Sequence, residues 1–432
     1  MPEFVFPSGF LWGASTSSHQ VEGGNTNNDW WAWEQVGRVK EPSGAACDQY
    51  HRFESDFELA RQLHHNAHRL SIEWSRIEPR EGEFDEHALA HYRTVVQALR
   101  QRGLEPVVTL HHYTNPLWLA QTGGWANPIV VERFARFARR TTDALGDHVR
   151  YWLTINEPMV YMVTHYLDGV GPPGEQNLQM AWRVLEHLVR AHVDAYHAIH
   201  DAARAKGRTA LVSIAHHVQP FLPCRRWWPP DRWIAALMER FYNFGFLEAV
   251  LHGRLSIPAR RALRIPEGTR TLDFIGMNYY GRIFMRLADL HPKHWGGSRC
   301  STRHHREVTE RNDMDWDVYP PGIRDVLGWG RPYQLPILIT ENGICTRDDR
   351  QRERFILNHL QWVARAIEEG VPVLGYLHWS LLDNFEWAHG FGPRFGLIEV
   401  DYATQERRIR DSARRYAEVC RSNRLSIDSR NA

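Results

Sequence analysis

The sequence predicts an α/β fold, namely a (β/α)8 TIM barrel that forms a single domain over residues 1–432 with extended βα loops. The first observation is that helical patterns alternate with short apolar, β-rich runs from near the N-terminus to about residue 380. The second is that these β-rich runs number eight, which is the number of strands that closes such a barrel. A doubly wound open sheet is the alternative, but it would bring a phosphate-binding G-x-G-x-x-G motif after an early strand, and the sequence has none there.

The eight expected strands are short apolar segments bounded by turn residues or polar residues. They are residues 10–14, 68–72, 106–110, 151–155, 209–214, 272–277, 335–340 and 373–377.

The expected helices precede strands, as the alternating pattern requires. In residues 85–102, apolar residues from Leu89 to Leu99 recur at helical spacing, and Gly103 ends the helix. Similar patterns occupy about 130–145, 181–204 and 351–369. The polar stretch 285–330 is the exception, and we expect it to be a long βα loop that influences specificity and not a domain linker.

The composition limits the classes of partner. Lys and Arg together number 52 and Asp and Glu number 51, so no net charge attracts nucleic acid or an anionic membrane. A neutral small molecule is the expected ligand, and 18 Trp and 15 Tyr could supply flat faces for sugar rings, although most will be core. The sequence does not indicate an oligomeric state.

Cysteine usage and the N-terminus bear on the compartment. The five cysteines are scattered and lack a C-x-x-C spacing, so the sequence indicates neither a disulfide framework nor a zinc site. No H-E-x-x-H motif occurs either, and we expect no metal and no cofactor. The N-terminus lacks a basic segment followed by an apolar one, and no run of 18 apolar residues exists. We therefore expect a soluble cytoplasmic protein.

Two short strings carry the chemistry. Glu157 follows the fourth expected strand in Thr154–Pro158 (TINEP), and Glu341 follows the seventh in Ile339–Gly343 (ITENG). Either string alone is typical of a helix cap or a turn. In a barrel, however, the carboxyl ends of the strands face one pocket, and two carboxyl groups in one pocket are what cleavage of a glycosidic bond requires. We therefore expect a sugar hydrolase.

Several further strings resemble those of family 1 glycoside hydrolases, the β-glucosidase family, and the resemblance covers nearly the whole chain. The strings are Phe10–Ser15 (FLWGAS), Gln20–Gly23 (QVEG), Arg69–Arg76 (RLSIEWSR), Asp273–Tyr280 (DFIGMNYY), Trp379–Trp387 (WSLLDNFEW), Arg394–Leu397 (RFGL) and Val400–Tyr402 (VDY).

The resemblance implies a retaining, exo-acting β-glycosidase that forms a covalent glycosyl-enzyme. Glu157 would be the acid/base and Glu341 the nucleophile, with carboxyl groups roughly 5–5.5 Å apart. The residues implied to support the nucleophile are Arg69, Asn278 and Tyr280. Those implied to bind the terminal sugar are Gln20, His112, Asn156, Trp379, Glu386 and Trp387. The substrates would be β-glycosides or short oligosaccharides.

The resemblance does not identify which sugar the protein prefers. A β-glucosidase with β-galactosidase or β-fucosidase activity fits best, and xylose or mannose preference is not readable. Where the family usually has His-Trp-Asp-Leu-Pro, this chain has His112–Pro116 (HYTNP), so one wall of the site differs. Two alternatives remain. One is a catalytically silent sugar-binding protein, against which both carboxylates argue. The other is a 6-phospho-β-glycosidase, against which the charge of Glu386 argues.

Overall fold

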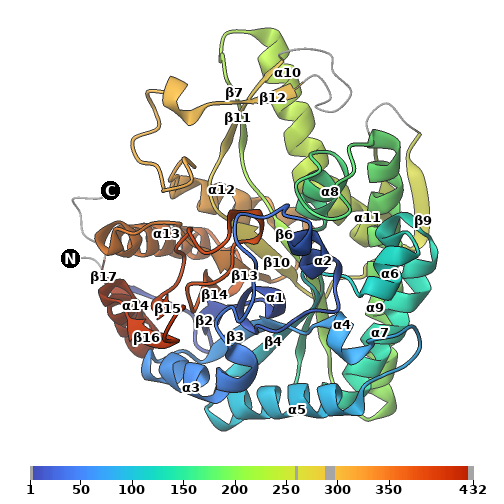
Figure 1. Ribbon diagram of the computed structural model, residues 1–432. Helices are drawn as coiled ribbons and strands as arrows, with labels where there is room; N and C mark the ends of the chain where they lie inside the picture. Colours follow the sequence, from blue (N-terminus) through green and yellow to red (C-terminus); the bar gives the residue numbers. More distant parts are fainter. Residues whose placement is uncertain (1–2, 258–260, 288–296, 427–432) are drawn as a thin grey trace.

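The computed structural model describes residues 3–257, 261–287 and 297–426, and its centre is a closed barrel of parallel strands (Figure 1). The order around the barrel is β10-β13-β14-β2-β3-β4-β5-β6, which confirms the predicted (β/α)8 fold. The barrel strands are β2 (Leu11–Ser15), β3 (Ala67–Ser71), β4 (Glu105–His111), β5 (Tyr151–Asn156), β6 (Leu211–His217), β10 (Ile275–Tyr279), β13 (Ile337–Asn342) and β14 (Val373–Trp379). Each predicted strand overlaps one of these, with ends shifted by a few residues.

A layer of apolar side chains closes the lower part of the barrel. Small and large residues share this layer, which makes it a packed core and not a channel. Its buried members are Ala67, Val107, Leu153, Ala215, Phe274, Leu338 and Leu377. Almost every barrel strand contributes a side chain to this layer, so the polar residues inside the barrel begin at one common level above it.

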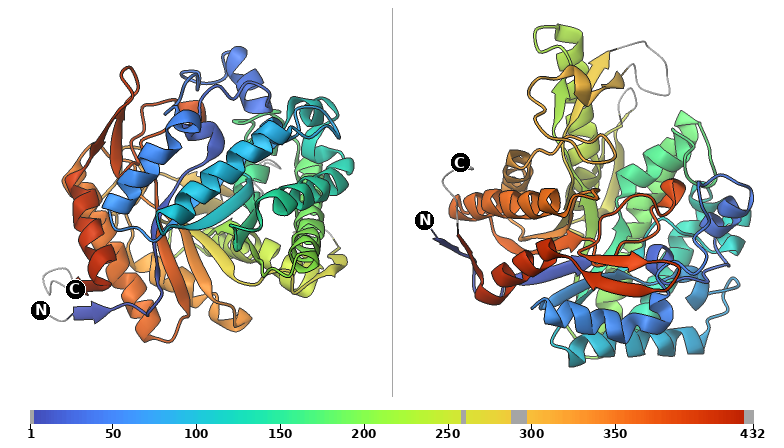
Figure 2. Two further views of the ribbon diagram at one scale, coloured as in Figure 1. Left: turned by 90° about the horizontal axis from the view of Figure 1, so that it is seen from below. Right: turned by 60° about the vertical axis from the view of Figure 1, so that its left-hand side comes forward.

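Helices surround the barrel, and the longer ones bury apolar residues in a common core with the strands (Figure 2). Helix α5 shows why they form where they do: Asp85 accepts hydrogen bonds from the backbone N–H groups of His87 and Ala88, and Gly103 follows the helix with φ +73°. The longer helices are α3 (Gln49–Gln62), α5 (Glu86–Gln101), α7 (Ile129–Leu145), α8 (Pro158–Tyr166), α9 (Leu178–Ala205), α10 (Pro229–Met238), α11 (Gly245–His252), α12 (Pro321–Gly328), α13 (Asp349–Glu368) and α14 (Asp411–Ser422). The short ones are α1 (Ser18–Val21), α2 (Asp29–Gln35), α4 (Trp74–Ile77) and α6 (Leu117–Gln121).

Among the described residues, three two-stranded sheets lie outside the barrel. Strand β1 pairs antiparallel with β17, so the first and last described residues lie side by side at one edge of the molecule (Figure 2). The pairs are β1 (Glu3–Val5) with β17 (Arg424–Ser426), β8 (Gly253–Leu255) with β9 (Leu263–Thr269), and β15 (Ile398–Asp401) with β16 (Glu406–Ile409).

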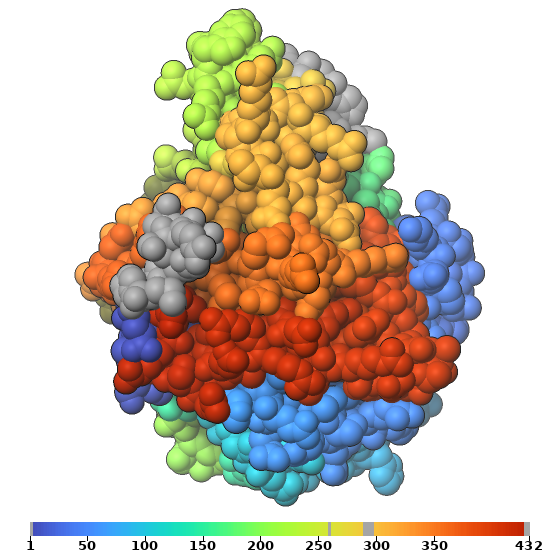
Figure 3. Space-filling model, turned by 90° about the vertical axis from the view of Figure 1, so that its left-hand side faces the viewer, coloured from blue at the N-terminus to red at the C-terminus, as the bar shows by residue number. Residues whose placement is uncertain are grey.

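The stretch 285–330 is more structured than the predicted loop. Strands β11 (Ile283–Leu287) and β12 (Gly297–Cys300) join β7 (Phe221–Pro223) in a small sheet, and α12 completes the sixth barrel unit. Together with α10 this sheet projects from the barrel (Figures 1 and 3). The stretch still leads from β10 to α12, as the predicted βα loop does, but its strands were not foreseen because β11 pairs with a strand more than 50 residues away.

The cysteines also differ from the prediction. Cys224 and Cys300 form a disulfide between the end of β7 and the end of β12, whereas the sequence had indicated no disulfide. Cys47, Cys345 and Cys420 are free and buried. Cys345 packs against Trp379 and Phe395 as a small buried residue. Within the described ranges, no helix is long and apolar enough to cross a membrane.

Candidate functional site

A cavity of about 480 Å³ opens above the apolar layer, at the carboxyl ends of the barrel strands. Nine of the residues that the sequence singled out line it: Gln20, His112, Asn156, Glu157, Tyr280, Glu341, Trp379, Glu386 and Trp387. The remaining two, Arg69 and Asn278, have no exposed surface and lie behind the lining, where they bond to residues that line it. The fold therefore brings every predicted site residue to one place.

Glu157 stands at the junction of a strand and a helix. Strand β5 ends at Asn156 and α8 begins at Pro158, so Glu157 makes the whole turn with a left-handed backbone, φ +45°. Proline suits the first position of a helix because the N–H it lacks would have no partner there. The backbone N–H of Glu157 donates to the carbonyl of Ala215 on β6, which holds this strained turn in place.

Glu341 lies within β13 and is held from two sides. Nη1 of Arg69 donates to Oε1 of Glu341, and the Tyr280 hydroxyl donates to Oε2 at 2.6 Å. Arg69 comes from β3, and Tyr280 follows β10. Both carboxylate oxygens therefore have a donor, one of them cationic, which are the contacts that the resemblance implied for this residue.

A continuous set of hydrogen bonds links Glu341 to Glu157. Nη2 of Arg69 donates to Oδ1 of Asn156 at 2.7 Å, and Nδ2 of Asn278 donates to the same oxygen at 3.2 Å. The Asn278 amide also donates to Oε1 of Glu157 at 2.9 Å. Asn278 thus contacts the acid/base candidate directly, although the sequence had grouped it with the nucleophile.

The two glutamates differ in their electrostatic surroundings. Burial raises the pKa of Glu157, and the hydrogen bonds from Tyr113 and Asn278 oppose this rise. Burial likewise raises the pKa of Glu341, to about 7, and the Arg69 guanidinium is the strongest opposing influence. Only Glu341 has a cation in contact, so Arg69 is what allows this carboxyl group to ionise near neutral pH.

Gln20 and Glu386 form a polar corner of the cavity. Nε2 of Gln20 donates to Oε2 of Glu386 at 3.3 Å and to Oδ1 of Asn384 at 3.0 Å. Burial, with repulsion from Glu341 and Glu157, raises the pKa of Glu386 to about 8. Because this shift favours the protonated form, a negative charge at Glu386 is a weak argument against a phosphorylated sugar.

Aromatic rings form the walls beside this corner. The imidazole of His112 is nearly parallel to the ring of Trp379, at a centroid distance of 5.9 Å, and to that of Trp387, at 6.2 Å. Nδ2 of Asn156 lies 3.2 Å from Nε2 of His112. Burial and then the nearby Arg69 lower the pKa of His112 well below its ordinary value, so the ring is neutral.

Tyr113 is a functional candidate that sequence reasoning missed. Its hydroxyl donates to Oε2 of Glu157, and its backbone is left-handed with φ +74°. The sequence had marked this position only as a departure from the family pattern. Its place directly after His112 and a strand end was the available signal, but a hydroxyl contact with Glu157 across 44 residues could not be read from it.

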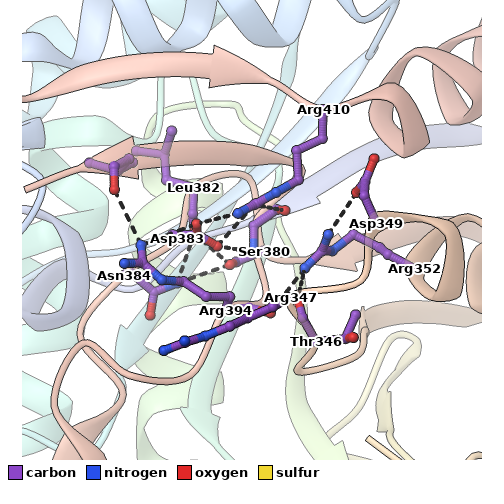
Figure 4. Close-up of polar contacts among 12 residues, drawn as sticks. Thr346, Arg347, Asp349, Arg352, Ser380, Leu382, Asp383, Asn384, Arg394 and Arg410 are labelled. Atoms are coloured by element: carbon purple, nitrogen blue, oxygen red, sulfur yellow. Dashed lines mark hydrogen bonds and ion pairs between the residues drawn. The ribbon is translucent and has the colours of Figure 1, made fainter. Parts of the chain in front are cut away.

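A buried ionic network supports the segment that carries Glu386 and Trp387 (Figure 4). Asp383 is fully buried and accepts hydrogen bonds from Arg410 at 2.7 and 3.0 Å and from Arg394 at 3.3 Å. Its neighbour Asn384 donates to the Ser380 hydroxyl at 2.9 Å. Because Asn384 also accepts from Gln20, this network reaches the polar corner of the cavity.

A barrel that places two buried glutamates, one after its fourth strand and one in its seventh, beside aromatic walls is a glycosidase of the (β/α)8 class. The chain belongs to glycosyl hydrolase family 1, because the model of that family matches residues 3–425. This confirms the family resemblance found in the sequence.

Individual relatives agree over almost the whole chain. A 1,4-beta-D-glucan glucohydrolase of Thermotoga neapolitana is 32% identical and covers 98% of this chain and 99% of its own. A beta-galactosidase of Sulfolobus acidocaldarius is also 32% identical, over 97% of this chain and 95% of its own. The solved structure of a beta-glycosidase from Pyrococcus horikoshii is 39% identical, covers 99% and 97% of the two chains and has a TM-score of 0.92.

The contact between Tyr113 and Glu157 predicts a pH effect. In Tyr113→Phe the carboxylate loses a donor that favours its ionised form, so the pKa of Glu157 should rise. The basic limb of kcat/KM against pH should move up by about 1–2 pH units, since a bond to a charged group contributes about 1.5–3 kcal/mol and one pKa unit is about 1.4 kcal/mol.

The matched control is Tyr333→Phe, which removes a hydroxyl that donates to Glu248 at 3.0 Å outside the cavity. It should leave the profile unchanged. An unshifted or acid-shifted basic limb in Tyr113→Phe would show that the hydroxyl does not stabilise the ionised acid.

The Asp383 network predicts a large effect on stability. Asp383→Ala leaves two partly buried guanidinium groups without their carboxylate, so the free energy of unfolding should fall by roughly 3–5 kcal/mol. Chemical denaturation followed by tryptophan fluorescence measures it. Glu406→Ala breaks an exposed pair with Arg408 and should leave the free energy of unfolding almost unchanged, because solvent screens such a pair. Equal losses in the two variants would contradict the importance of the buried network.

Proposed function

We propose that this protein is a retaining, exo-acting β-glycosidase, and that β-glucosides are its preferred substrates, with β-galactosides and β-fucosides also accepted. The observation that carries the proposal is the unequal pair of buried glutamates: Glu341 bonds to a guanidinium and a phenol, whereas Glu157 bonds only to neutral donors. Such a pair holds one ionised and one protonated carboxyl group at the same pH.

In the first step, Glu341 attacks the anomeric carbon as the bond to the leaving oxygen breaks, and Glu157 gives its proton to that oxygen. The products are a glycosyl ester on Glu341 and a free alcohol. In the second step, Glu157, now ionised, takes a proton from water, which attacks the anomeric carbon and releases Glu341. Two inversions at one carbon give overall retention, which requires carboxyl groups roughly 5–5.5 Å apart.

The same contacts explain the change in the pKa of Glu157 between the steps. The charge of Glu157 raises the pKa of Glu341, and the charge of Glu341 acts on Glu157 in the same way because the repulsion is mutual. When Glu341 becomes an ester its charge disappears, and Glu157 ionises more readily. Arg69 then bonds to a neutral ester oxygen and to Asn156, so its position is kept through the cycle.

The terminal sugar lies between the polar corner and the aromatic walls in this proposal. Gln20 and Glu386 bind the hydroxyls farthest from the scissile bond, and Asn156 binds the 2-hydroxyl, a contact that strengthens in the transition state. A protonated Glu386 can donate as well as accept, so it can bind two neighbouring hydroxyls at once. Trp379 and Trp387 contact the C–H faces of the ring.

The two alternatives make different demands on the site. A silent binding protein needs no second carboxylate, and here both carboxylates are present with separate sets of donors. A 6-phospho-β-glycosidase needs cations near the 6-position. Of the side chains that the structure describes, Gln20 alone bonds to Glu386, which leaves that corner without a cationic contact.

Azide rescue tests the roles of the two glutamates. Glu341→Ala should hydrolyse a p-nitrophenyl β-glycoside at least about 10⁴-fold more slowly, because the nucleophile is absent. Azide should restore turnover and give the α-glycosyl azide, identified by NMR. Glu157→Ala with azide should give the β-glycosyl azide, since azide then replaces water in the second step. If the Glu341 variant gave the β-azide and the Glu157 variant the α-azide, the roles of the two glutamates would be reversed. If neither variant lost activity, neither glutamate would be catalytic.

The stereochemistry of the first product tests retention itself. ¹H NMR of a β-glycoside digest should show the β-sugar first, with the α-sugar appearing only by slow mutarotation. Early α-sugar would establish inversion and carboxyl groups roughly 6.5–9.5 Å apart. A panel of p-nitrophenyl glycosides run in parallel gives the preference among glucose, galactose, fucose, xylose and mannose.

A further inference from the structure

A cluster of sulfur and imidazole groups lies at the rim of the cavity, apart from the two glutamates. Cys224 follows β7 and Cys300 ends β12, and one ring nitrogen of His305 lies within 4.8 Å of both sulfur atoms. Nδ1 of His304 lies 3.7 Å from Sγ of Cys300. Cys224, Cys300 and His305 thus converge from two segments, and His304 lies beside Cys300, although the sequence assigned none of them a role.

His305 has features that a disulfide does not require. The residue is 7% exposed and its ring stacks on Phe284 with centroids 3.6 Å apart. Nε2 is buried and has no hydrogen-bond partner, which costs free energy unless something binds it. The other nitrogen, Nδ1, lies 3.7 Å from the carboxylate of Glu307. This leaves Nε2 free to bind a ligand while Nδ1 faces a carboxylate.

We propose that the reduced protein binds one Zn²⁺ between Cys224, Cys300 and His305, with His304 as the fourth ligand. Two thiolates and two imidazoles are a common tetrahedral set for structural zinc. Glu307 stands where a carboxylate orients a ligating histidine.

Reduction of the disulfide and binding of zinc are two separate steps. A dithiol reductant transfers two electrons and two protons to the Cys224–Cys300 disulfide, which becomes two thiols while the reductant becomes a cyclic disulfide. Zinc then displaces the two thiol protons and binds both sulfur atoms as thiolates. Oxidation of the thiols by another disulfide would release the metal, so this position alternates between a covalent and a metal cross-link.

Either cross-link holds the same wall of the cavity. Arg299, Ser301 and Thr302 line the cavity next to Cys300, and the segment after β7 carries α10. A zinc ion at this position would therefore join the projecting sheet to the rim when the disulfide is reduced. Thermal stability should rise on zinc binding, because only the folded chain brings the ligands together.

Metal binding by the reduced full-length protein tests the proposal. Reduction with a phosphine is verified by titrating all five cysteine thiols in denaturant. Bound metal is then removed, and a control shows that the reduced protein is still folded. On adding Zn²⁺ we expect one ion per chain by native mass spectrometry. We also expect tetrahedral d–d bands and a thiolate-to-metal charge-transfer band with Co²⁺, together with an upward shift in Tm on adding Zn²⁺.

Variants locate the ion. Cys224→Ser and His305→Ala should each weaken zinc binding by about 100-fold or more, measured by competition with a chromophoric chelator. Cys420→Ser removes a buried cysteine elsewhere and should bind as the unmodified protein does. Absence of zinc binding by the fully reduced protein would overturn the proposal, and so would unchanged binding in both ligand variants. Hydrolysis of an aryl glycoside is a separate readout and does not decide this question.

Discussion

One buried guanidinium organises the centre of this barrel. Arg69 has no exposed surface, and its nitrogens donate to Glu341, to Asn156 at 2.7 Å and to the Thr109 hydroxyl at 3.0 Å. A buried cation with fewer partners would cost several kcal/mol, so these contacts are required for the residue to be there at all. Because the partners stand on three other strands, Arg69 fixes the relative positions of the carboxylate, the amide and the strand ends that carry them.

The balance of charge around Arg69 determines the protonation states. Glu157, Glu341 and Glu386 are all buried in one cavity, and burial raises the pKa of each. Of these three glutamates, Glu341 is the one that Arg69 contacts, so its carboxyl group is the one best able to ionise. The protonated forms of Glu157 and Glu386 are then favoured, because a second negative charge in this buried cavity would be repelled by that of Glu341. One ion pair thereby accounts for the proposed difference between Glu157 as the acid and Glu341 as the nucleophile.

The sequence predicted what depends on repeated local pattern. The alternation of helix and strand gave all eight barrel strands, and the ends of two of them gave Glu157 and Glu341. The sequence did not predict the small sheet of β7, β11 and β12 or the disulfide between Cys224 and Cys300. Both depend on pairing between segments far apart in the chain, and no repeating sequence pattern indicates such pairing. Tyr113 was missed for another reason: a single hydroxyl acquires its role only when folding brings it to a carboxylate.

The outer wall of the cavity depends on a second buried arginine and not on the barrel. Arg282 pairs with Asp317, donates to the carbonyl of Glu307 at 3.1 Å and stacks over Tyr319 at 3.8 Å. These contacts join the segment after β10 to the one before α12, and the wall between them includes Trp316. Loops held by their own ion pair can vary without disturbing Arg69 and its partners on the strands. Selectivity for the part of the substrate beyond the terminal sugar can therefore change while the catalytic pair is kept.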